Sequence, residues 1–470
     1  MGRGNAVAQM GGETVLRGGT LVDQTGERRG DVLVRDGRIV AVEESIDAAV
    51  GATVLDAGGC IVAPGLVDLH AHLREPGGEI AETVESGSRA AALGGYTAVV
   101  AMPNTEPAID SAAIARDVLA LGDKALVEIA VAGAITLGRR GDKLVPMAEL
   151  ARLGVRLFTD DGKGVQHGGL MRRALEYASG LGVVLAQHCE DEQIAAGGQM
   201  HEGAWSSRLG IAGQPALAEE AMLARDLALV RLTGAPMHFL HLSTAGSVQM
   251  IKRAKAEGLG VTCEVTPHHL ALSDAAVASF DPIYKVNPPL RTALDVAAVR
   301  AGLRAGVVDA IATDHAPHAP ERKDDPFEEA PAGMLGLETA LAVGYGVLCA
   351  DPDGGVEEAD DHGWVRRGAA KSLALRDLFA LFSWQPARIA GLERDGRGLR
   401  GDRGGQGGPI RPGAAANLTV FDPSAQWVVE PSLLASRSRN TPYAGRRLTG
   451  KVRHTVFAGE AVVLDGAPQR

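Results

Sequence analysis

Both ends of the chain carry short stretches in which apolar and polar positions alternate. Residues 14–62 contain three such stretches, and Asp36 and Gly37 lie between two of them. A period of two is typical of strands with one buried face, and Asp-Gly favours a two-residue hairpin turn. The same pattern returns after a glycine-rich stretch at 396–413. We therefore expect residues 1–62 and 396–470 to form the two parts of one small β-sandwich domain.

The middle of the chain, residues 63–395, has a different pattern. Short apolar runs that end in polar residues alternate there with helical segments rich in alanine and leucine. Eight runs can be counted: 61–70, 96–104, 127–136, 155–161, 183–188, 237–243, 261–269 and 308–315. Repeated strand–helix units build parallel sheets, and eight of them close a barrel. The predicted fold is therefore α/β, a (β/α)8 TIM-type barrel with the small β domain beside it.

Composition narrows the class of protein. The 47 Lys and Arg against 58 Asp and Glu give a formal net charge of −11, without a basic cluster, which argues against a nucleic-acid partner. No apolar run has the length of a membrane span, and the first residues lack the apolar stretch of a signal peptide. Four scattered cysteines favour neither disulfides nor a thiolate zinc site. We expect a cytoplasmic globular protein without a membrane partner.

Polar residues gather where the predicted barrel strands end. They are His70 and His72 in and after the first run, Asn104 after the second, Asp161 after the fourth, His188 after the fifth, His241 after the sixth and Asp314 after the eighth. The third and seventh runs supply no candidate ligand. Because chemistry in such barrels collects at the carboxyl ends of the strands, these side chains are predicted to share one site.

The residue types in this set are those of a metal site. His70 and His72 are two apart on a strand, so both imidazoles face one side, although such a pair alone suits surface or core histidines equally well. The other members add the nitrogen and oxygen ligands that zinc accepts. Six ligands exceed the needs of one tetrahedral ion, whereas two ions that share a carboxylate would use them all. Asp161 is the predicted bridge.

Seven motifs in this order resemble the bacterial dihydroorotases: DLHAHLREPG, AMPNT, FTDDG, QHCED, HLST, VNPPLR and ATDHAPH. The resemblance covers most of residues 60–340. It is to the class in which an aspartate replaces the carboxylated lysine that bridges the metals of other amidohydrolases. It implies a cofactor of zinc ions (Zn2+), two per chain or one. The implied ligands are His70, His72, Asp161, His188, His241 and Asp314.

Asp160 and Lys163 compete with Asp161 for the bridging position. A carboxylated lysine must lie on the strand and face the metals, whereas Lys163 falls in the turn that follows. Strand parity and the resemblance favour Asp161 over Asp160. Each of the two carboxylates also suits an outer partner that fixes a histidine tautomer.

The resemblance implies reversible hydrolysis of dihydroorotate to N-carbamoyl-L-aspartate in pyrimidine biosynthesis. An acidic protein needs local positive charge for this anionic substrate, and Arg74 offers a planar fork for its carboxylate, with a salt bridge at the barrel rim as the alternative. Asp314 is expected to carry a proton from the attacking hydroxide to the leaving ring nitrogen. The implied substrate-binding residues are His72, Arg74, Asn104, Asn287, His318, Ala332 and Gly333. The family pattern often has phenylalanine where Ala332 stands, so only backbone contacts are expected there.

The polar segment 318–333 is predicted to be either a mobile lid or an ordinary solvated loop. The remaining histidines are expected to be structural or solvent-facing, and His315 to lie behind the ligands. These structural histidines include His167, His201, His238, His268, His269, His362 and His454.

Two other interpretations of the sequence stay open. An allantoinase or dihydropyrimidinase would share the barrel and metals, but those relatives usually carry the bridging lysine and lack the pairing of HLREP with MPNT. A non-catalytic partner of aspartate carbamoyltransferase would have lost metal ligands, and all six positions are filled here. A homo-oligomer and a complex with aspartate carbamoyltransferase are both compatible with the sequence.

Overall fold

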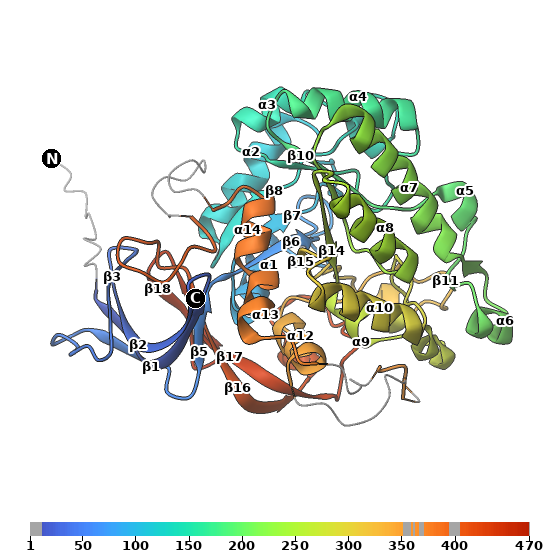
Figure 1. Cartoon of the computed structure of the whole chain (residues 1–470). Helices are drawn as coiled ribbons and strands as arrows, with labels where there is room; N and C mark the ends of the chain where they lie inside the picture. Colours follow the sequence, from blue (N-terminus) through green and yellow to red (C-terminus); the bar gives the residue numbers. More distant parts are fainter. Residues whose placement is uncertain (1–11, 351–358, 361, 366–370, 394–404, 470) are drawn as a thin grey trace, which may run out of the picture.

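A computed structural model of the chain describes residues 12–350, 359–360, 362–365, 371–393 and 405–469. Figure 1 shows two parts, a barrel wrapped by helices and a sheet in which strands from both chain ends lie side by side. No helix among the described residues has the length and apolar character needed to cross a membrane.

Eight parallel strands close the predicted barrel. They are β6 (Leu66–Ala71), β7 (Tyr96–Ala101), β8 (Glu128–Val131), β9 (Leu157–Phe158), β10 (Val184–Gln187), β13 (Met237–Phe239), β14 (Val261–Val265) and β15 (Ala310–Ile311). Ladders join β6 to β8 and β9 to β15, and a parallel bridge between Gly133 and Phe158 links the two sets. A second bridge, between Ala71 and His315, closes the ring. Each strand overlaps one of the eight apolar runs, so the predicted (β/α)8 barrel is confirmed.

Helices cover the outside of the barrel. They are α1 (Val84–Leu93), α2 (Ala112–Leu121), α3 (Met147–Arg152), α4 (Gly168–Ser179), α7 (Ala216–Thr233), α8 (Ala245–Ala256), α10 (Ala293–Arg304), α13 (Leu375–Phe382) and α14 (Trp384–Ile389). Threonine starts three of them: the side chains of Thr83, Thr244 and Thr292 each accept the backbone N–H three residues on, which satisfies a donor that the helix leaves free.

Shorter elements lie in the connections at the carboxyl ends of the strands. After β10 the chain forms α5 (Glu192–Ala195), β11 (Met200–His201), α6 (Ala204–Leu209) and β12 (Gly213–Gln214). After β14 it forms α9 (Pro267–Ala271), and after β15 it forms α11 (Pro320–Lys323) and α12 (Ala340–Leu348). Single 3-10 turns occupy Gly122–Lys124, Leu137–Arg139, Asp274–Ser279, Pro282–Tyr284 and Pro431–Leu433.

The strands of the two chain ends form one nine-stranded sheet. It contains β1 (Thr14–Asp23), β2 (Gly26–Arg35), β3 (Arg38–Glu43), β4 (Thr53–Asp56), β5 (Ile61–Pro64), β16 (Leu418–Val428), β17 (Arg447–Phe457), β18 (Glu460–Leu464) and β19 (Ala467–Pro468). Antiparallel pairing of β16 with β5 joins the two ends. The expected hairpin turn is present: Asp36 and Gly37 separate β2 from β3, and both have the positive φ of a type I′ turn, 51° and 76°.

The terminal sheet has an apolar core of its own, distinct from that of the barrel. Leu21, Val34, Ile39, Val62 and Val456 are among its buried members, so residues from both ends pack together. This agrees with a small domain assembled from the two termini, and hydrogen bonds connect its strands continuously. The predicted boundary at 395–396 falls outside the described residues.

The barrel interior is filled with side chains. One buried cluster takes Leu69 from β6, Val100 from β7, Leu157 from β9, Ala186 from β10 and Ala310 from β15. Residues from so many strands meet only inside the closed barrel, which is therefore a packed core and not a pore. The polar side chains described next sit at the carboxyl end of this core.

Candidate active site

The structure brings the six predicted ligands together at one rim of the barrel. They come from the ends of five strands: His70 and His72 from β6, Asp161 from β9, His188 from β10, His241 from β13 and Asp314 from β15. All are buried, and none is more than 5% exposed. The convergence predicted from the strand ends is therefore present in the fold.

Asp161 lies at the centre of four imidazole rings. Its Oδ2 is 3.3 Å from Nε2 of His70 and 3.6 Å from Nε2 of His72. Its Oδ1 is 3.5 Å from Nδ1 of His188 and 3.4 Å from Nε2 of His241. One carboxylate oxygen faces each pair of histidines, which is the arrangement expected of a ligand shared by two cations.

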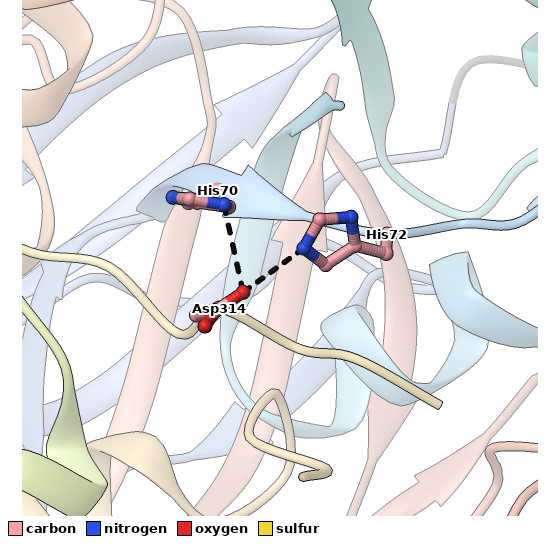
Figure 2. Close-up of side chains that lie close together, drawn as sticks. All are labelled: His70, His72 and Asp314. Atoms are coloured by element: carbon pink, nitrogen blue, oxygen red, sulfur yellow. Dashed lines mark hydrogen bonds and ion pairs between the residues drawn. The ribbon is translucent and has the colours of Figure 1, made fainter. Parts of the chain in front are cut away.

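Asp314 faces the histidine pair of β6. Figure 2 shows its carboxylate pointing toward the rings of His70 and His72. Its Oδ1 is 2.9 Å from Nε2 of His72 and 3.5 Å from Nε2 of His70. Ligand atoms of these three residues lie close enough to hold one cation, and those of His70, Asp161 and His241 form a second such group.

Two buried atoms in this cluster fit a metal ion. Nε2 of His70 and Oδ1 of Asp161 have no hydrogen-bond partner among the described residues. A buried polar atom without a partner destabilises a fold by about 1–3 kcal/mol, and a divalent cation between the rings would satisfy both atoms. Imidazole nitrogens and carboxylate oxygens are ligands that zinc accepts. The residues present therefore fit the metal that the sequence predicts.

The electrostatics of the cluster also favour cations. Burial by itself lowers the pKa of His70, but Asp161 and Asp314 outweigh burial and hold that pKa well above its ordinary value. Burial also lowers the pKa of His188, but Asp161 and Glu190 outweigh burial and raise that pKa to about 10. A field that attracts protons to these rings attracts metal ions equally well.

Three of the four histidines have an outer partner on the ring nitrogen that faces away from the cluster. The pairs are His70 Nδ1 with Glu264 Oε1 (2.8 Å), His72 Nδ1 with Asn104 Oδ1 (2.8 Å) and His188 Nε2 with Glu190 Oε2 (3.2 Å). An acceptor on the outer nitrogen fixes the tautomer and leaves the inner lone pair for a cation.

Sequence reasoning missed Glu264 and Glu190. Glu264 lies in the middle of the buried strand β14, in the seventh run, which was expected to supply nothing to the site. Glu190 is two residues beyond His188 in the QHCED motif. A carboxylate within an apolar strand was the available signal for Glu264, whereas the contact of Glu190 depends on how the chain turns after β10.

The structure separates the three candidates for the bridging position. Asp160 turns away from the histidines: its Oδ1 accepts the N–H groups of Ile135 and Thr136, at 2.8 and 3.0 Å. Lys163 is exposed in the turn that follows β9. Of the three, only Asp161 contacts the four rings, and both aspartates lie beyond the end of β9.

A cavity of about 210 Å³ opens onto this cluster. All seven predicted substrate-binding residues line it, together with Asp161, His188, His241 and Asp314: His72, Arg74, Asn104, Asn287, His318, Ala332 and Gly333. His70 is not among the lining residues and lies fully buried. The predicted substrate residues and metal ligands therefore share one cavity.

Arg74 forms no ion pair with a carboxylate in the part of the chain that the structure describes. Its Nε donates to the carbonyl oxygen of Pro317 at 3.1 Å. Burial lowers the pKa of Arg74 to about 10, so the guanidinium is still charged at neutral pH. The alternative of a salt bridge at the rim is not found, and the positive charge faces a cavity without a protein anion paired to it.

The ring of His318 packs closely against the backbone of Ala332 and Gly333. Burial lowers the pKa of His318 to about 3, so the ring is neutral and its Nε2 pairs with the carbonyl oxygen of Ala332 at 2.8 Å. Gly333 has a φ of 144°, and a Cβ there would lie 2.7 Å from Nε2 of His318. Only glycine fits this close approach.

Three residues around the cavity have left-handed backbone conformations. The φ angles are 61° at Arg74, 32° at His241 and 46° at Asp314. Such conformations are unfavourable for residues with a Cβ and persist where the surrounding structure fixes them, often at functional sites. The backbone thus aims these three side chains in a way that ideal strands would not.

Two lysines attach the segment 318–333 to the stretch around residues 282–285 of the same chain. Lys323 Nζ donates to the carbonyl oxygens of Pro282 and Pro331, both at 2.8 Å. Lys285 Nζ donates in return to the carbonyl oxygens of Phe327 and Glu328, both at 2.9 Å. These hydrogen bonds attach the segment that carries His318 and Gly333 to the chain at 282–285.

We expect Lys323→Met to raise several-fold the KM for a substrate that binds in this cavity and to change kcat less. The variant loses the hydrogen bonds that Lys323 donates to Pro282 and Pro331, and Pro331 directly precedes Ala332 and Gly333 at the cavity. Steady-state kinetics measures both constants, and Arg322→Met, at an exposed neighbouring position, is the control. A KM equal to that of the control would contradict this role of Lys323.

Several of the other histidines are buried in structural contacts. His238 pairs with Glu264, His269 lies 2.8 Å from Thr266 Oγ1, and His315 Nε2 is 3.3 Å from Glu82 Oε2. His201 lies 3.2 Å from a guanidinium nitrogen of Arg291. None of these belongs to the six-ligand cluster.

Comparison with known proteins identifies the family. A family model described as dihydro-orotase-like matches residues 59–247. A dihydroorotase of Pelotomaculum thermopropionicum is 45% identical over 96% of this chain and 98% of its own length. A dihydroorotase of Mycobacterium tuberculosis is 45% identical over 93% of this chain and 96% of its own length. The solved L-hydantoinase (dihydropyrimidinase) of Arthrobacter aurescens is 24% identical, covers 98% of both chains and gives a TM-score of 0.80, which supports the fold.

The solved hydantoinase shares the fold of this chain, the barrel together with the sheet built from both termini. The two dihydroorotases are 45% identical to this chain over nearly its whole length, and the chain belongs to the dihydroorotase family.

Proposed function

We propose that this chain catalyses the reversible hydrolysis of dihydroorotate to N-carbamoyl-L-aspartate, in pyrimidine biosynthesis. The observation that carries the proposal is a single cavity in which Arg74 offers an unpaired positive charge beside the ligand cluster. Such a cavity suits a ring amide that carries a carboxylate, because the guanidinium fork binds the carboxylate while the cluster faces the amide. The relatives named dihydroorotase support the same assignment.

The proposed cofactor is a pair of zinc ions held by the six residues of the cluster, with Asp161 as the shared ligand. When bound, the ions polarise the ring carbonyl and acidify a water molecule. Oδ1 and Oδ2 of Asp161 face different histidine pairs, which supports an aspartate bridge in place of a carboxylated lysine.

In the proposed mechanism Asp314 moves the proton. Its carboxylate lies at the cavity, where it accepts a proton from the attacking water and delivers it to the leaving ring nitrogen. Arg74, Asn104, Asn287 and His318 hold the substrate, and the backbone of Ala332 and Gly333 contacts the ring. In the closing direction the same carboxylate takes the proton from the carbamoyl nitrogen.

The test is to give the zinc-loaded protein dihydroorotate, dihydrouracil, hydantoin and allantoin in parallel and to follow ring opening by absorbance. We expect turnover of dihydroorotate alone, because the other rings lack the carboxylate that Arg74 would bind. Arg74→Gln should then raise the KM for dihydroorotate by about tenfold or more, since a charged hydrogen-bonded pair is lost. Turnover of dihydrouracil or hydantoin without turnover of dihydroorotate would overturn the assignment.

A cytoplasmic location, self-association and a complex with aspartate carbamoyltransferase remain predictions from the sequence. Gel filtration with light scattering, with and without the carbamoyltransferase, tests the last two.

A further inference from the structure

We propose that Glu264 is a positioning residue for His70, and that it acts from within a buried chain of polar groups inside the barrel. The proposal rests on the proposed metal site and adds to it a residue outside the six ligands. Glu264 does not line the cavity, so any effect it has on the site is exerted through His70.

The contacts of Glu264 form an unbroken chain. Its Oε1 is 2.8 Å from Nδ1 of His70, and its Oε2 is 3.0 Å from Nε2 of His238. Nδ1 of His238 is in turn 2.8 Å from Oγ1 of Thr262. Glu264, His70 and His238 are each 0% exposed, so water does not compete for these contacts.

Strand alternation explains why these groups meet inside the barrel. Met237 and Phe239 of β13, and Cys263 and Val265 of β14, belong to the large apolar cluster that also contains helix residues. Neighbours in a strand point to opposite faces, so the residues between them point inward. The inward residues are His238, Thr262 and Glu264, and two adjacent strands thus place a polar group below the ligand cluster.

With both imidazoles neutral, as a metal ion on Nε2 requires of His70, these contacts allow one arrangement of protons. An ionised carboxylate only accepts hydrogen bonds, so both His70 Nδ1 and His238 Nε2 must donate to Glu264. Nδ1 of His238 then carries a lone pair, which accepts the hydroxyl proton of Thr262. With its proton on Nδ1, His70 presents the lone pair of Nε2 toward Asp161 and Asp314.

This arrangement gives Glu264 a function that packing alone does not explain. Burying a carboxylate inside an apolar barrel is unfavourable, and a neutral side chain of the same shape would avoid that penalty. A carboxylate on the outer nitrogen fixes the ring and makes the inner nitrogen a stronger ligand, an effect typically worth 10- to 100-fold in metal affinity. Its two oxygens let one residue order two rings.

The test compares Glu264→Gln with Glu338→Gln. Glu338 is half-buried, accepts the backbone N–H of Ala435 at 2.8 Å and lies outside the site. The dissociation constant for zinc is measured on each folded, metal-free protein by competition with a chromogenic chelator. The visible spectrum of each cobalt-substituted protein reports ligand geometry independently of turnover.

We expect Glu264→Gln to bind zinc about 10- to 100-fold more weakly than the parent and to change the cobalt spectrum, with Glu338→Gln within about twofold of the parent. Parent-like affinity and spectrum in Glu264→Gln would overturn the inference. That result would leave the proposed function intact as long as the parent protein turns over dihydroorotate. Loss of both metal binding and turnover in the parent itself would instead refute the proposed function.

A second measurement needs no variant and so applies even if Glu264→Gln does not fold. In the zinc-loaded parent protein, nitrogen-15 NMR of the histidine rings should find His70 protonated on Nδ1 and His238 protonated on Nε2. Metal on Nδ1 of His70, or a proton on Nδ1 of His238 in place of Nε2, would contradict the chain of contacts proposed here.

Discussion

Replacing Asp314 with asparagine is expected to lower the turnover of dihydroorotate by about 10²- to 10⁴-fold, the usual contribution of a positioned acid or base. Asparagine keeps the shape of the side chain and one oxygen toward His72, which lies 2.9 Å from Oδ1 in the parent. It cannot, however, accept a proton from water and return it to nitrogen. We therefore expect bound metal to be retained while kcat falls.

The Asp314→Asn substitution must lower kcat/KM by the same factor for ring opening and for ring closure. The variant cannot alter the equilibrium between dihydroorotate and carbamoyl-aspartate, so kcat/KM for ring opening and for ring closure fall by one factor. Kinetics in both directions and metal analysis of the purified protein measure these quantities. The control is Asp325→Asn, which changes a carboxylate on the polar segment 318–333 away from the cavity. A rate near that of the control would show that Asp314 does not transfer the proton. A loss of bound metal would show that Asp314 acts only as a metal ligand.

The barrel could be predicted because its strands are short apolar runs with a polar residue at the end. The run 183–188 became β10 followed by His188, and 308–315 became β15 followed by Asp314. In a closed barrel the carboxyl ends of all the strands lie at the same rim. The positions of the strand ends were therefore enough to predict that ligands far apart in sequence lie close together. The hairpin at Asp36 was predictable for a similar reason, because its turn is local.

Contacts across the barrel could not be predicted in the same way. Alternation in β14 puts Thr262 and Glu264 on one face, but it does not say that His238 and His70 stand opposite. Residues beyond the strands, such as Asn287 and His318, lie in long connections whose course no local pattern determines. Their place at the cavity was expected from the family resemblance and not from spacing. The left-handed φ angles at Arg74 and Asp314 likewise depend on the whole rim.

The adjacent aspartates after β9 allow a sharp test of the metal site. We expect Asp161→Asn to lose zinc and activity together, because the side chain gives one oxygen to each histidine pair. The substitution removes the negative charge that contacts all four rings, whereas Asp314 contacts only the rings of His70 and His72. Metal content should fall well below two ions per chain, and zinc affinity by more than about 100-fold, since weakening an outer partner alone already costs 10- to 100-fold.

Asp160→Asn is the matched control, with the same chemical change one residue earlier. Its carboxylate accepts the N–H groups of Ile135 and Thr136 and the hydroxyl of Thr136, so the substitution should lower the free energy of unfolding by about 1–3 kcal/mol. We expect both metal ions to remain and the rate to stay within about tenfold of the parent. Metal analysis, steady-state rates and thermal unfolding of the two variants separate the roles. Because neighbouring residues on a strand face opposite sides, an exchange of the two outcomes would mean that the parity assigned to β9 is wrong, and the bridge would pass to Asp160.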